Sequence, residues 1–258
     1  MDDENPKNPV VLVHGMWSTP NTLVELKQQF EEQGYTVYVP RLPYHYDLKA
    51  MTAERCDGLK SSAIEDYVSV VSDLVRSLDT PPILVGHSLG GLIAQIVAAN
   101  HECNKLILFS SAAPAGINAL SWTVLRTFGH NLFRLPMWSS LMDLNKNIVA
   151  YGIANSQGKK LQEDILAQAT LESGYVAWQI AMWFLYKTPK TTVNFAKVLC
   201  PVLVIAGSED RITPIRTQRK IASRYRAATL LEIKGACHWT VGGSYLGVIA
   251  PKVFSWIA

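Results

Sequence analysis

The stretch that decides the fold is ILVGHSLGG, residues 83–91: a short apolar run, a serine between glycines, and then at once the apolar segment that starts at Leu92. This pattern predicts a strand, a tight turn with Ser88 at its apex, and a helix. Because a serine on so sharp a turn needs neighbours without Cβ atoms, the flanking glycines favour a nucleophile elbow. A glycine-rich turn that happens to contain a serine is the structural alternative.

The composition is that of one large globular domain. The chain has 258 residues, of which 48% are hydrophobic, and it contains no run of Pro, Ser or Gly that would serve as a linker. These features predict one sizeable core with a possible inserted subdomain. The basic residues are scattered and the formal net charge is only +3, so we expect no nucleic-acid partner.

The chain shows no pattern typical of export or of a membrane span. Its first residues are acidic and polar, unlike a signal peptide, and the longest apolar stretches, residues 83–99 and 175–186, are interrupted by polar side chains. We therefore expect no stable membrane insertion. The four cysteines are widely spaced without a metal-ligand pattern, which favours reduced thiols and a cytoplasmic location. They are Cys56, Cys103, Cys200 and Cys237. A disulfide between Cys200 and Cys237 is the alternative.

Short apolar runs alternate with longer amphipathic segments, which is typical of a parallel sheet covered by helices. Six parallel strands are predicted, at residues 10–13, 36–39, 83–86, 106–110, 202–206 and 229–233. Helical periodicity marks residues 19–33, 61–78, 89–100, 214–225 and 245–257. The predicted fold class is α/β, with a mainly parallel sheet of about six strands flanked by helices.

Residues 115–197 break this alternation. They contain no convincing strand but several helical stretches rich in aromatic residues, so we predict an all-helical insertion, the cap segment, in a core formed by residues 1–114 and 198–258. Most of these aromatics suit the insertion's own core, but an insertion of this size cannot bury all of them. Some should line an apolar pocket against the sheet. The tryptophans expected to contact a substrate are Trp17, Trp138, Trp183 and Trp239.

A serine nucleophile needs two partners elsewhere in the chain. Its hydroxyl is unreactive at neutral pH unless a base accepts the proton, and an acid must fix the base's tautomer. An acidic loop with Glu209 and Asp210 follows the fifth predicted strand, and a loop with His238 follows the sixth. Both loops lie at the sheet edge that carries Ser88. We expect His238 as the base and Asp210 as the acid, preferred to Glu209 because it directly precedes the turn into the next helix.

Four other histidines suit different roles. His87 lies inside the elbow and is expected to pack beneath the turn rather than act as a base. His45, His101 and His130 fall in predicted loops or at a helix end, so we expect solvated surface side chains there.

Acyl transfer also requires hydrogen-bond donors at the developing oxyanion, and backbone N–H groups serve best. Leu89 supplies one such group at a helix N-terminus, where unpaired N–H groups and the helix dipole favour negative charge. The second is expected from Met16, in the loop His14-Gly15-Met16-Trp17 after the first strand, because Gly15 lets this loop approach closely. A plain strand-to-helix turn is the structural alternative.

Taken together, these motifs resemble those of the α/β-hydrolase superfamily over essentially the whole chain. The resemblance is carried by His14-Gly15, Gly86-His87-Ser88-Leu89-Gly90-Gly91, Gly207-Ser208-Glu209-Asp210-Arg211-Ile212-Thr213-Pro214 and Gly235 to Trp239. It implies the same catalytic roles for these residues and a helical cap over the site. The serine at the elbow argues against the dehalogenase and epoxide-hydrolase branches, which have Asp there.

The stretch Leu171-Glu172-Ser173-Gly174-Tyr175, at the start of the last cap helix, looks like a motif of uncharacterised bacterial members of the superfamily. Ser173 suits a helix N-cap. Glu172 has a second interpretation, in which it reaches the mouth of the pocket.

The sequence therefore predicts a serine hydrolase that cleaves carboxylic esters through an acyl-enzyme, with an apolar substrate group under the cap segment. No metal and no organic cofactor is expected, and the partner is a small apolar ester. Because fold and motifs are shared among subfamilies, a thioesterase, lactonase or lyase with the same residues stays open. A non-catalytic ligand-binding protein is the alternative from another class. The oligomeric state is left open.

Overall fold

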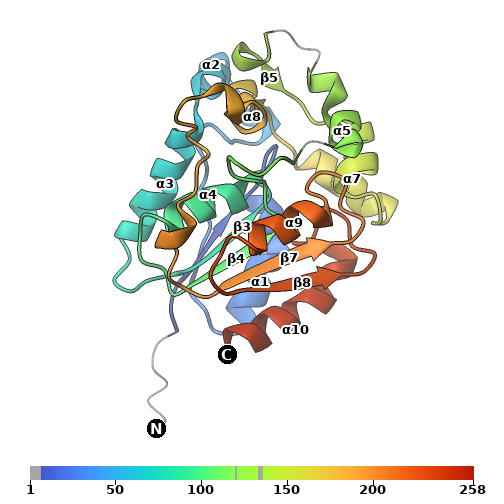
Figure 1. The fold of residues 1–258 in the computed structure, drawn as a ribbon. Coiled ribbons are helices and arrows are strands. Elements are labelled where there is room, and N and C mark those ends of the chain that lie inside the picture. The colour runs from blue at the N-terminus through green and yellow to red at the C-terminus, as the bar shows by residue number, and fades with distance from the viewer. Residues whose placement is uncertain (1–6, 120, 133–135) are drawn as a thin grey trace.

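A computed structural model describes residues 7–119, 121–132 and 136–258 of the chain. Its centre is a six-stranded sheet in the order β2-β1-β3-β4-β7-β8, in which all neighbouring strands are parallel (Figure 1). The strands are β1 (Val10–Val13), β2 (Val37–Tyr38), β3 (Ile83–His87), β4 (Lys105–Phe109), β7 (Val202–Gly207) and β8 (Ala228–Ile233). The six predicted strands are confirmed, each to within one residue at either end.

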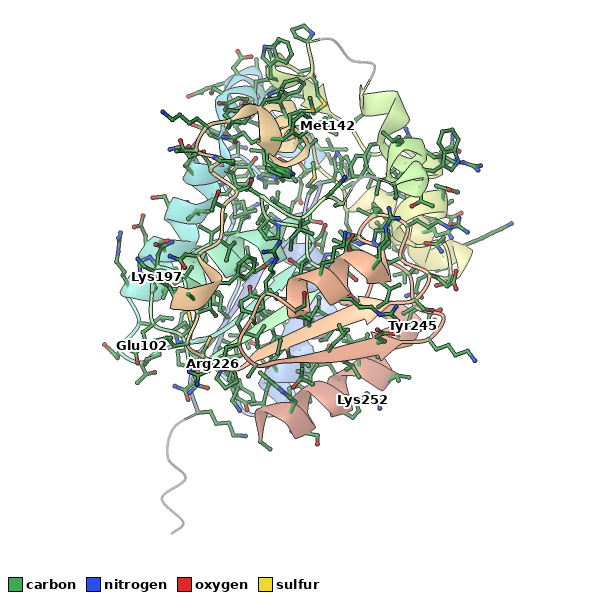
Figure 2. All side chains as sticks on the ribbon, in the orientation of Figure 1. Glu102, Met142, Lys197, Arg226, Tyr245 and Lys252 are labelled. Atoms are coloured by element: carbon green, nitrogen blue, oxygen red, sulfur yellow. The ribbon has the colours of Figure 1, made fainter. Side chains whose placement is uncertain are left out.

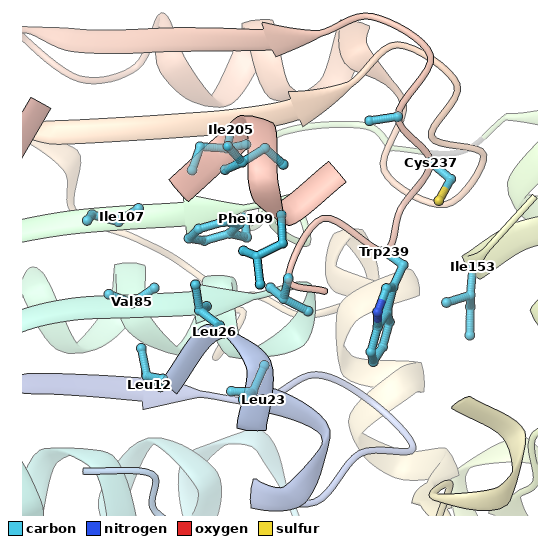
Figure 3. Packing of buried hydrophobic residues seen from close by; sticks show 14 of the residues in the cluster. Leu12, Leu23, Leu26, Val85, Ile107, Phe109, Ile153, Ile205, Cys237 and Trp239 are labelled. Atoms are coloured by element: carbon cyan, nitrogen blue, oxygen red, sulfur yellow. The ribbon is translucent and has the colours of Figure 1, made fainter. Parts of the chain in front are cut away.

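The central strands are buried on both faces of the sheet. Successive residues of β1 contact opposite layers: Leu12 belongs to the apolar cluster on one face, and Val11 and Val13 to the cluster on the other. Figure 3 shows the first of these clusters, where Leu12 and Val85 lie beside Leu23 and Leu26. Burial on both faces explains why these strands read as continuous apolar runs in the sequence instead of alternating with polar residues.

Helices cover both faces of the sheet. Residues of α1 (Val24–Glu32) and α10 (Leu246–Ile257) pack into the cluster on one face. Those of α3 (Ile64–Arg76), α4 (Leu89–Ala98) and α9 (Ile215–Ala222) pack into the cluster on the other. The helices predicted at these places are confirmed, with shorter bounds, and together with the sheet they form the three-layer architecture of an α/β domain.

One helix in the core has no counterpart among the predicted elements. It is α2 (Ala53–Ser61), whose single buried residue is Leu59, so its sequence lacks an apolar stripe. Thr52 caps its N-terminus by accepting a hydrogen bond from Arg55 N at 3.3 Å. Three short 3₁₀ turns complete the core, η1 (Pro20–Leu23), η2 (Leu48–Ala50) and η7 (Gly243–Tyr245).

The cap segment packs over the carboxyl ends of the strands (Figure 1). Its helical elements are α5 (Trp122–Leu132), η3 (Met137–Ser139), α6 (Lys146–Ile148), η4 (Val149–Ile153), α7 (Lys159–Ala167), α8 (Gly174–Ala181), η5 (Trp183–Leu185) and η6 (Phe195–Lys197). The segment is not helical throughout, because β5 (Leu141–Met142) pairs antiparallel with β6 (Glu172–Ser173). Two residues per strand are too few to show alternation in the sequence. Met142 marks this pairing in Figure 2.

All four cysteines are free, so Cys200 and Cys237 form no disulfide. Within the described residues, no helix is both long and apolar enough to cross a membrane. The same part of the chain holds no group of three or more His, Cys, Asp or Glu side chains placed to bind a metal ion. The cytoplasmic location stays a prediction.

Candidate active site

Ser88 lies at the apex of the turn between β3 and α4. Its backbone has φ 54° and ψ −119°, a region that costs a non-glycine residue about 1–3 kcal/mol. A Cβ atom at Gly86 would overlap the backbone of Gly90, and a Cβ atom at Gly90 would overlap the backbone of Val13. Gly86 therefore lets α4 follow the turn closely, and Gly90 lets the start of α4 pack against β1, as a nucleophile elbow requires.

His238 and Asp210 form a buried hydrogen-bonded pair at the same edge of the sheet. Asp210 follows β7 and His238 follows β8, and His238 Nδ1 lies 2.9 Å from Asp210 Oδ2. The two side chains are 3% and 0% exposed. His238 lines the same cavity as Ser88. Because Nδ1 donates to the carboxylate, Nε2 of the neutral ring is the nitrogen that can accept a proton.

The Asp210 carboxylate is held by several donors. Oδ1 accepts from Ile212 N and Thr213 N, both at 2.8 Å, and the Thr213 hydroxyl lies 2.8 Å from Oδ2. Burial raises the pKa of Asp210, but the charge and hydrogen bond of His238 and the hydrogen bonds from Thr213 outweigh it, so the pKa is lowered. Asp210 is therefore charged at neutral pH, whereas the alternative acid, Glu209, is exposed. The sequence did not predict this role of Thr213, for which the only signal is its place three residues after Asp210.

His87 packs against the expected base. Its ring centroid lies 5.0 Å from that of His238, and its Nε2 lies 3.1 Å from the His238 carbonyl oxygen, so Nε2 carries the proton. Burial, and next the charge of His238, lower the pKa of His87 to about 3. The ring is therefore neutral, and its hydrogen bond fixes the backbone that carries His238.

The expected oxyanion donors lie on two segments that face Ser88. Gly15, Met16 and Leu89 line the same cavity as Ser88. A Cβ atom at Gly15 would stand 3.0 Å from Ser88 Cβ, so this loop passes close to the serine. Leu89 is the first residue of α4, where N–H groups have no acceptor within the helix. The geometry is compatible with Met16 N–H and Leu89 N–H as the two donors.

A cavity of about 420 Å³ lies between the cap segment and the carboxyl edge of the sheet. Of the tryptophans expected to contact a substrate, Trp17, Trp183 and Trp239 line it, and Figure 3 shows Trp239 facing Ile153 of the cap segment. The expectation for Trp138 is corrected. Trp138 is outside the lining, 48% exposed, and packs on another cap tryptophan with ring centroids 4.9 Å apart. Helical periodicity in the cap segment is too irregular to assign it to a face.

His45, expected at the surface, and Glu172, for which the pocket mouth is the second interpretation, are both buried in the interior. His45 and Glu172 are both 0% exposed, and His45 Nε2 lies 3.2 Å from Glu172 Oε2. Glu172 does not line the cavity. These residues are 127 positions apart, so no local pattern signals their contact. The predicted N-cap is confirmed, because Ser173 Oγ accepts from Val176 N at 3.3 Å. The side chain of His130 lies outside the described residues.

Comparison with known families agrees with this geometry. The model of the alpha/beta hydrolase family matches residues 10–244, most of the chain. The chain therefore belongs to the alpha/beta hydrolase family, and the predicted fold class is confirmed.

Individual relatives are distant. The chain is 23% identical to the monoacylglycerol lipase of Mycolicibacterium smegmatis, over 99% of this chain and 89% of the relative. It is 25% identical to the magnesium-chelatase 30 kDa subunit of Rhodobacter capsulatus, over 88% of this chain and 79% of the relative. The solved structure of the Paleococcus ferrophilus monoacylglycerol lipase superimposes with a TM-score of 0.70 at 20% identity, covering 97% of this chain and 95% of that one.

Proposed function

We propose that the chain is a carboxylic ester hydrolase in which Ser88 is the nucleophile, His238 the general base and Asp210 the acid that orients it. The observation that carries this proposal is the buried Asp210–His238 hydrogen bond, at the edge of the sheet where Ser88 is held at positive φ. Family membership supports a hydrolase, and two relatives named as monoacylglycerol lipases support cleavage of esters.

The reaction begins with attack of Ser88 Oγ on the ester carbonyl carbon. As the new Oγ–C bond forms, the hydroxyl proton passes to His238 Nε2, and the charged Asp210 carboxylate stabilises the resulting imidazolium. The tetrahedral intermediate then expels the alcohol, which takes the proton from His238, and leaves an acyl group on Ser88. Water, deprotonated by His238, attacks the acyl group and releases the carboxylic acid, so that both the serine and the base are regenerated.

Negative charge on the former carbonyl oxygen is stabilised by backbone N–H groups. Met16 N–H and Leu89 N–H are the two donors, one from each side of Ser88. Fixed donors of this kind act on charge that develops in the transition state, and removal of one typically costs about 100- to 1,000-fold in kcat.

The cap segment provides the apolar contacts of the substrate. The lining above Ser88 is formed mainly by hydrophobic side chains, among them Val124, Leu125 and Phe128 of α5 and Ile180 of α8. A carbonyl held at the serine leaves its acyl or alcohol group among these side chains. The cavity volume of about 420 Å³ is within the range of small-molecule sites. We therefore assign a small apolar ester as substrate.

The test is the initial rate of hydrolysis of p-nitrophenyl esters from acetate to palmitate, for the wild type, Ser88→Ala and Ser111→Ala. Ser111 is a matched control because it is a buried serine just after β4 that is not part of the cavity lining. We expect Ser88→Ala to lose the activity, Ser111→Ala to keep it, and the chain-length optimum to measure the space under the cap segment.

Equal rates in the wild type and Ser88→Ala would overturn the proposal. Substrates cleaved by other chemistry, or a ligand-binding role without catalysis, would then have to be tested in its place.

A further inference from the structure

A second carboxylate–imidazole pair lies buried where the cap segment meets the core. Glu172, in β6, faces His45, in the loop after β2, and neither is exposed. Glu172 Oε1 accepts from the Tyr67 hydroxyl and from Ser173 N, both at 2.8 Å. The proposed mechanism uses none of these groups, although burying a charge costs several kcal/mol of desolvation unless it is well paired.

Each ring nitrogen of His45 faces an oxygen atom. Nδ1 lies 2.9 Å from the Pro43 carbonyl oxygen, and Nε2 faces the Glu172 carboxylate. A carbonyl oxygen and a carboxylate oxygen are both acceptors, so this surrounding suits a ring that donates from both nitrogens. Burial lowers the pKa of His45, but the charge and hydrogen bond of Glu172 and the nearby carbonyls outweigh it, so the pKa is raised. We therefore expect His45 to be an imidazolium paired with the Glu172 carboxylate.

The charged His45 ring stands beside the buried ring of His14, with centroids 5.3 Å apart. His14 Nε2 accepts from Leu42 N at 3.3 Å, so the proton of His14 is on Nδ1. Burial, and next the charge of His45, lower the pKa of His14 to about 3. Arg41, which donates to the His45 carbonyl oxygen at 2.9 Å, adds a second positive charge. His14 is therefore neutral and in a single tautomer.

The protonated Nδ1 of His14 lies 3.1 Å from the Gly15 carbonyl oxygen. This carbonyl belongs to the peptide whose N–H is that of Met16. In a trans peptide the C=O and the N–H point in opposite directions, so a carbonyl held at His14 turns the Met16 N–H to the opposite side. Gly15 and Met16 line the cavity together with Ser88. Donation to the carbonyl also polarises the peptide and makes its N–H a stronger donor.

We propose that Glu172 is a positioning residue for the oxyanion hole: through the ring of His45, which packs against His14, it holds the His14 ring in the place from which Nδ1 orients the peptide between Gly15 and Met16. The inference rests on the proposed function, because it needs Met16 as an oxyanion donor. Glu172 is outside the cavity lining, so it acts through His45 and touches no substrate. The cap segment thereby sets the catalytic geometry in addition to covering the site.

Two further hydrogen bonds hold the other end of the same loop to the cap segment. Thr170 N donates to the Trp17 carbonyl oxygen at 2.9 Å. Trp17 Nε1 donates to the Met142 carbonyl oxygen at 3.2 Å. The cap segment therefore contacts both ends of the loop from His14 to Trp17. At the Trp17 end it does so through Met142 and Thr170. At the His14 end it does so through Glu172 and the ring of His45.

The test uses Glu172→Gln, which removes the charge and keeps the shape. Its amide oxygen can still accept from Tyr67 and Ser173, and its amide nitrogen can donate to a His45 ring that has lost one proton. We expect kcat for p-nitrophenyl esters to fall about tenfold with little change in KM, as for an interaction made only in the transition state. An alkyl trifluoromethyl ketone, which adds to Ser88 and places an oxyanion in the hole, should bind about tenfold more weakly. The matching methyl ketone should bind as it does to the wild type.

Gln179→Ala is the matched control. Gln179, in α8, is also a buried cap residue bonded to the core, since its Oε1 accepts from Ile64 N at 2.9 Å. We expect this variant to lose stability without changing the ratio of the two ketone affinities. A second measurement needs no variant: ¹⁵N NMR of histidine-labelled wild type should show His45 protonated at both nitrogens and His14 neutral with its proton on Nδ1.

Three results would overturn the inference: an unchanged trifluoromethyl ketone affinity in Glu172→Gln, an equal loss for both ketones, or a neutral His45 in the wild type. Its failure is distinguishable from that of the proposed function. If wild-type hydrolysis does not depend on Ser88, the proposed function fails. If it does depend on Ser88 and any of the three results is obtained, only the role of Glu172 fails.

Discussion

The molecule contains two buried carboxylate–imidazole pairs, Asp210–His238 and Glu172–His45, which look alike in burial and in hydrogen bonding of the carboxylate. They differ at the imidazole. Both ring nitrogens of His45 face acceptors, the Pro43 carbonyl and the Glu172 carboxylate. Among the described residues, the ring hydrogen bonds of His238 are all made by Nδ1. Only His238 also lines the cavity with Ser88.

This difference shows that burial and a carboxylate partner are not enough to make a histidine a catalytic base. A base needs one ring nitrogen without a permanent partner and a path from that nitrogen to the substrate. His238 meets both conditions. His45 meets neither, because both of its ring nitrogens face acceptors and its side chain is outside the cavity lining, so we expect it to position its neighbours. Changes in the first pair should therefore act on turnover, whereas changes in the second should act first on stability and on the geometry of the loop.

The largest effect is expected from Asp210→Asn. The amide cannot hold the His238 ring in the tautomer that leaves Nε2 free, so kcat should fall by about 10⁴-fold with the fold intact. Steady-state kinetics and circular dichroism check both parts. Glu209→Gln, at the exposed neighbouring carboxylate, is the control and should behave as the wild type. A larger loss of kcat in Glu209→Gln than in Asp210→Asn would assign the acid to Glu209.

Glu172→Ala is expected to have the next largest effect. Removing one partner of a buried ion pair leaves the other charge uncompensated, so the free energy of unfolding should fall by about 3–5 kcal/mol. Urea denaturation measures this loss. Asp164→Ala, which removes a surface ion pair with Lys160, is the control and should change stability by less than about 1 kcal/mol. If the two variants lose the same free energy of unfolding, the Glu172–His45 pair stabilises the fold no more than a surface ion pair does.

The sequence was sufficient to predict the sheet and the first pair, and the reason is physical. Buried parallel strands produce continuous apolar runs, and loops at their carboxyl ends gather at one edge, so Ser88, Asp210 and His238 could be brought together from chain order alone. The second pair leaves no such trace. His45 lies in a polar loop that resembles a solvated surface, and its partner stands 127 residues away in a two-residue strand. Long-range polar contacts of this kind are set by packing of the cap segment on the core.

A smaller effect is expected from pH. Titration of the buried histidines changes the free energy of unfolding in opposite directions. His45 has a raised pKa, so its contribution is fully present below the unfolded value of 6.5 and is lost as the pH rises through the folded value. His14 and His87 have pKa values lowered to about 3, so their burial costs stability below pH 6.5, and stability rises with pH there. Urea denaturation over a pH series should therefore give a maximum.

Glu172→Gln sharpens this experiment. It should remove the fall that His45 causes just above pH 6.5 and leave the rise on the acid side, because His14 and His87 remain buried and neutral. The fall above pH 9.0 should stay, because burial raises the pKa of the Cys103 thiol from that value. A variant that keeps the fall between pH 6.5 and 9.0 would show that His45 is not the group responsible.

The smallest effect is expected in the cap segment. Trp183 lines the cavity and Trp138 does not. Trp183→Ala should raise KM for the longer p-nitrophenyl esters about fivefold, since part of the apolar contact of the substrate is lost. Trp138→Ala should leave KM within about twofold of the wild type, because this side chain packs on Trp178 outside the lining. A larger change in KM for Trp138→Ala would place the substrate elsewhere under the cap segment.

The most direct test of the central claim, that Ser88 is a nucleophile activated by the Asp210–His238 pair, is the intact mass of the protein after treatment with an alkyl fluorophosphonate. The account predicts that the wild type gains one phosphonyl group, located at Ser88 by peptide mapping, that Ser88→Ala gains none, and that His238→Ala is labelled far more slowly. An unlabelled wild type, or equal labelling of the wild type and Ser88→Ala, would contradict it.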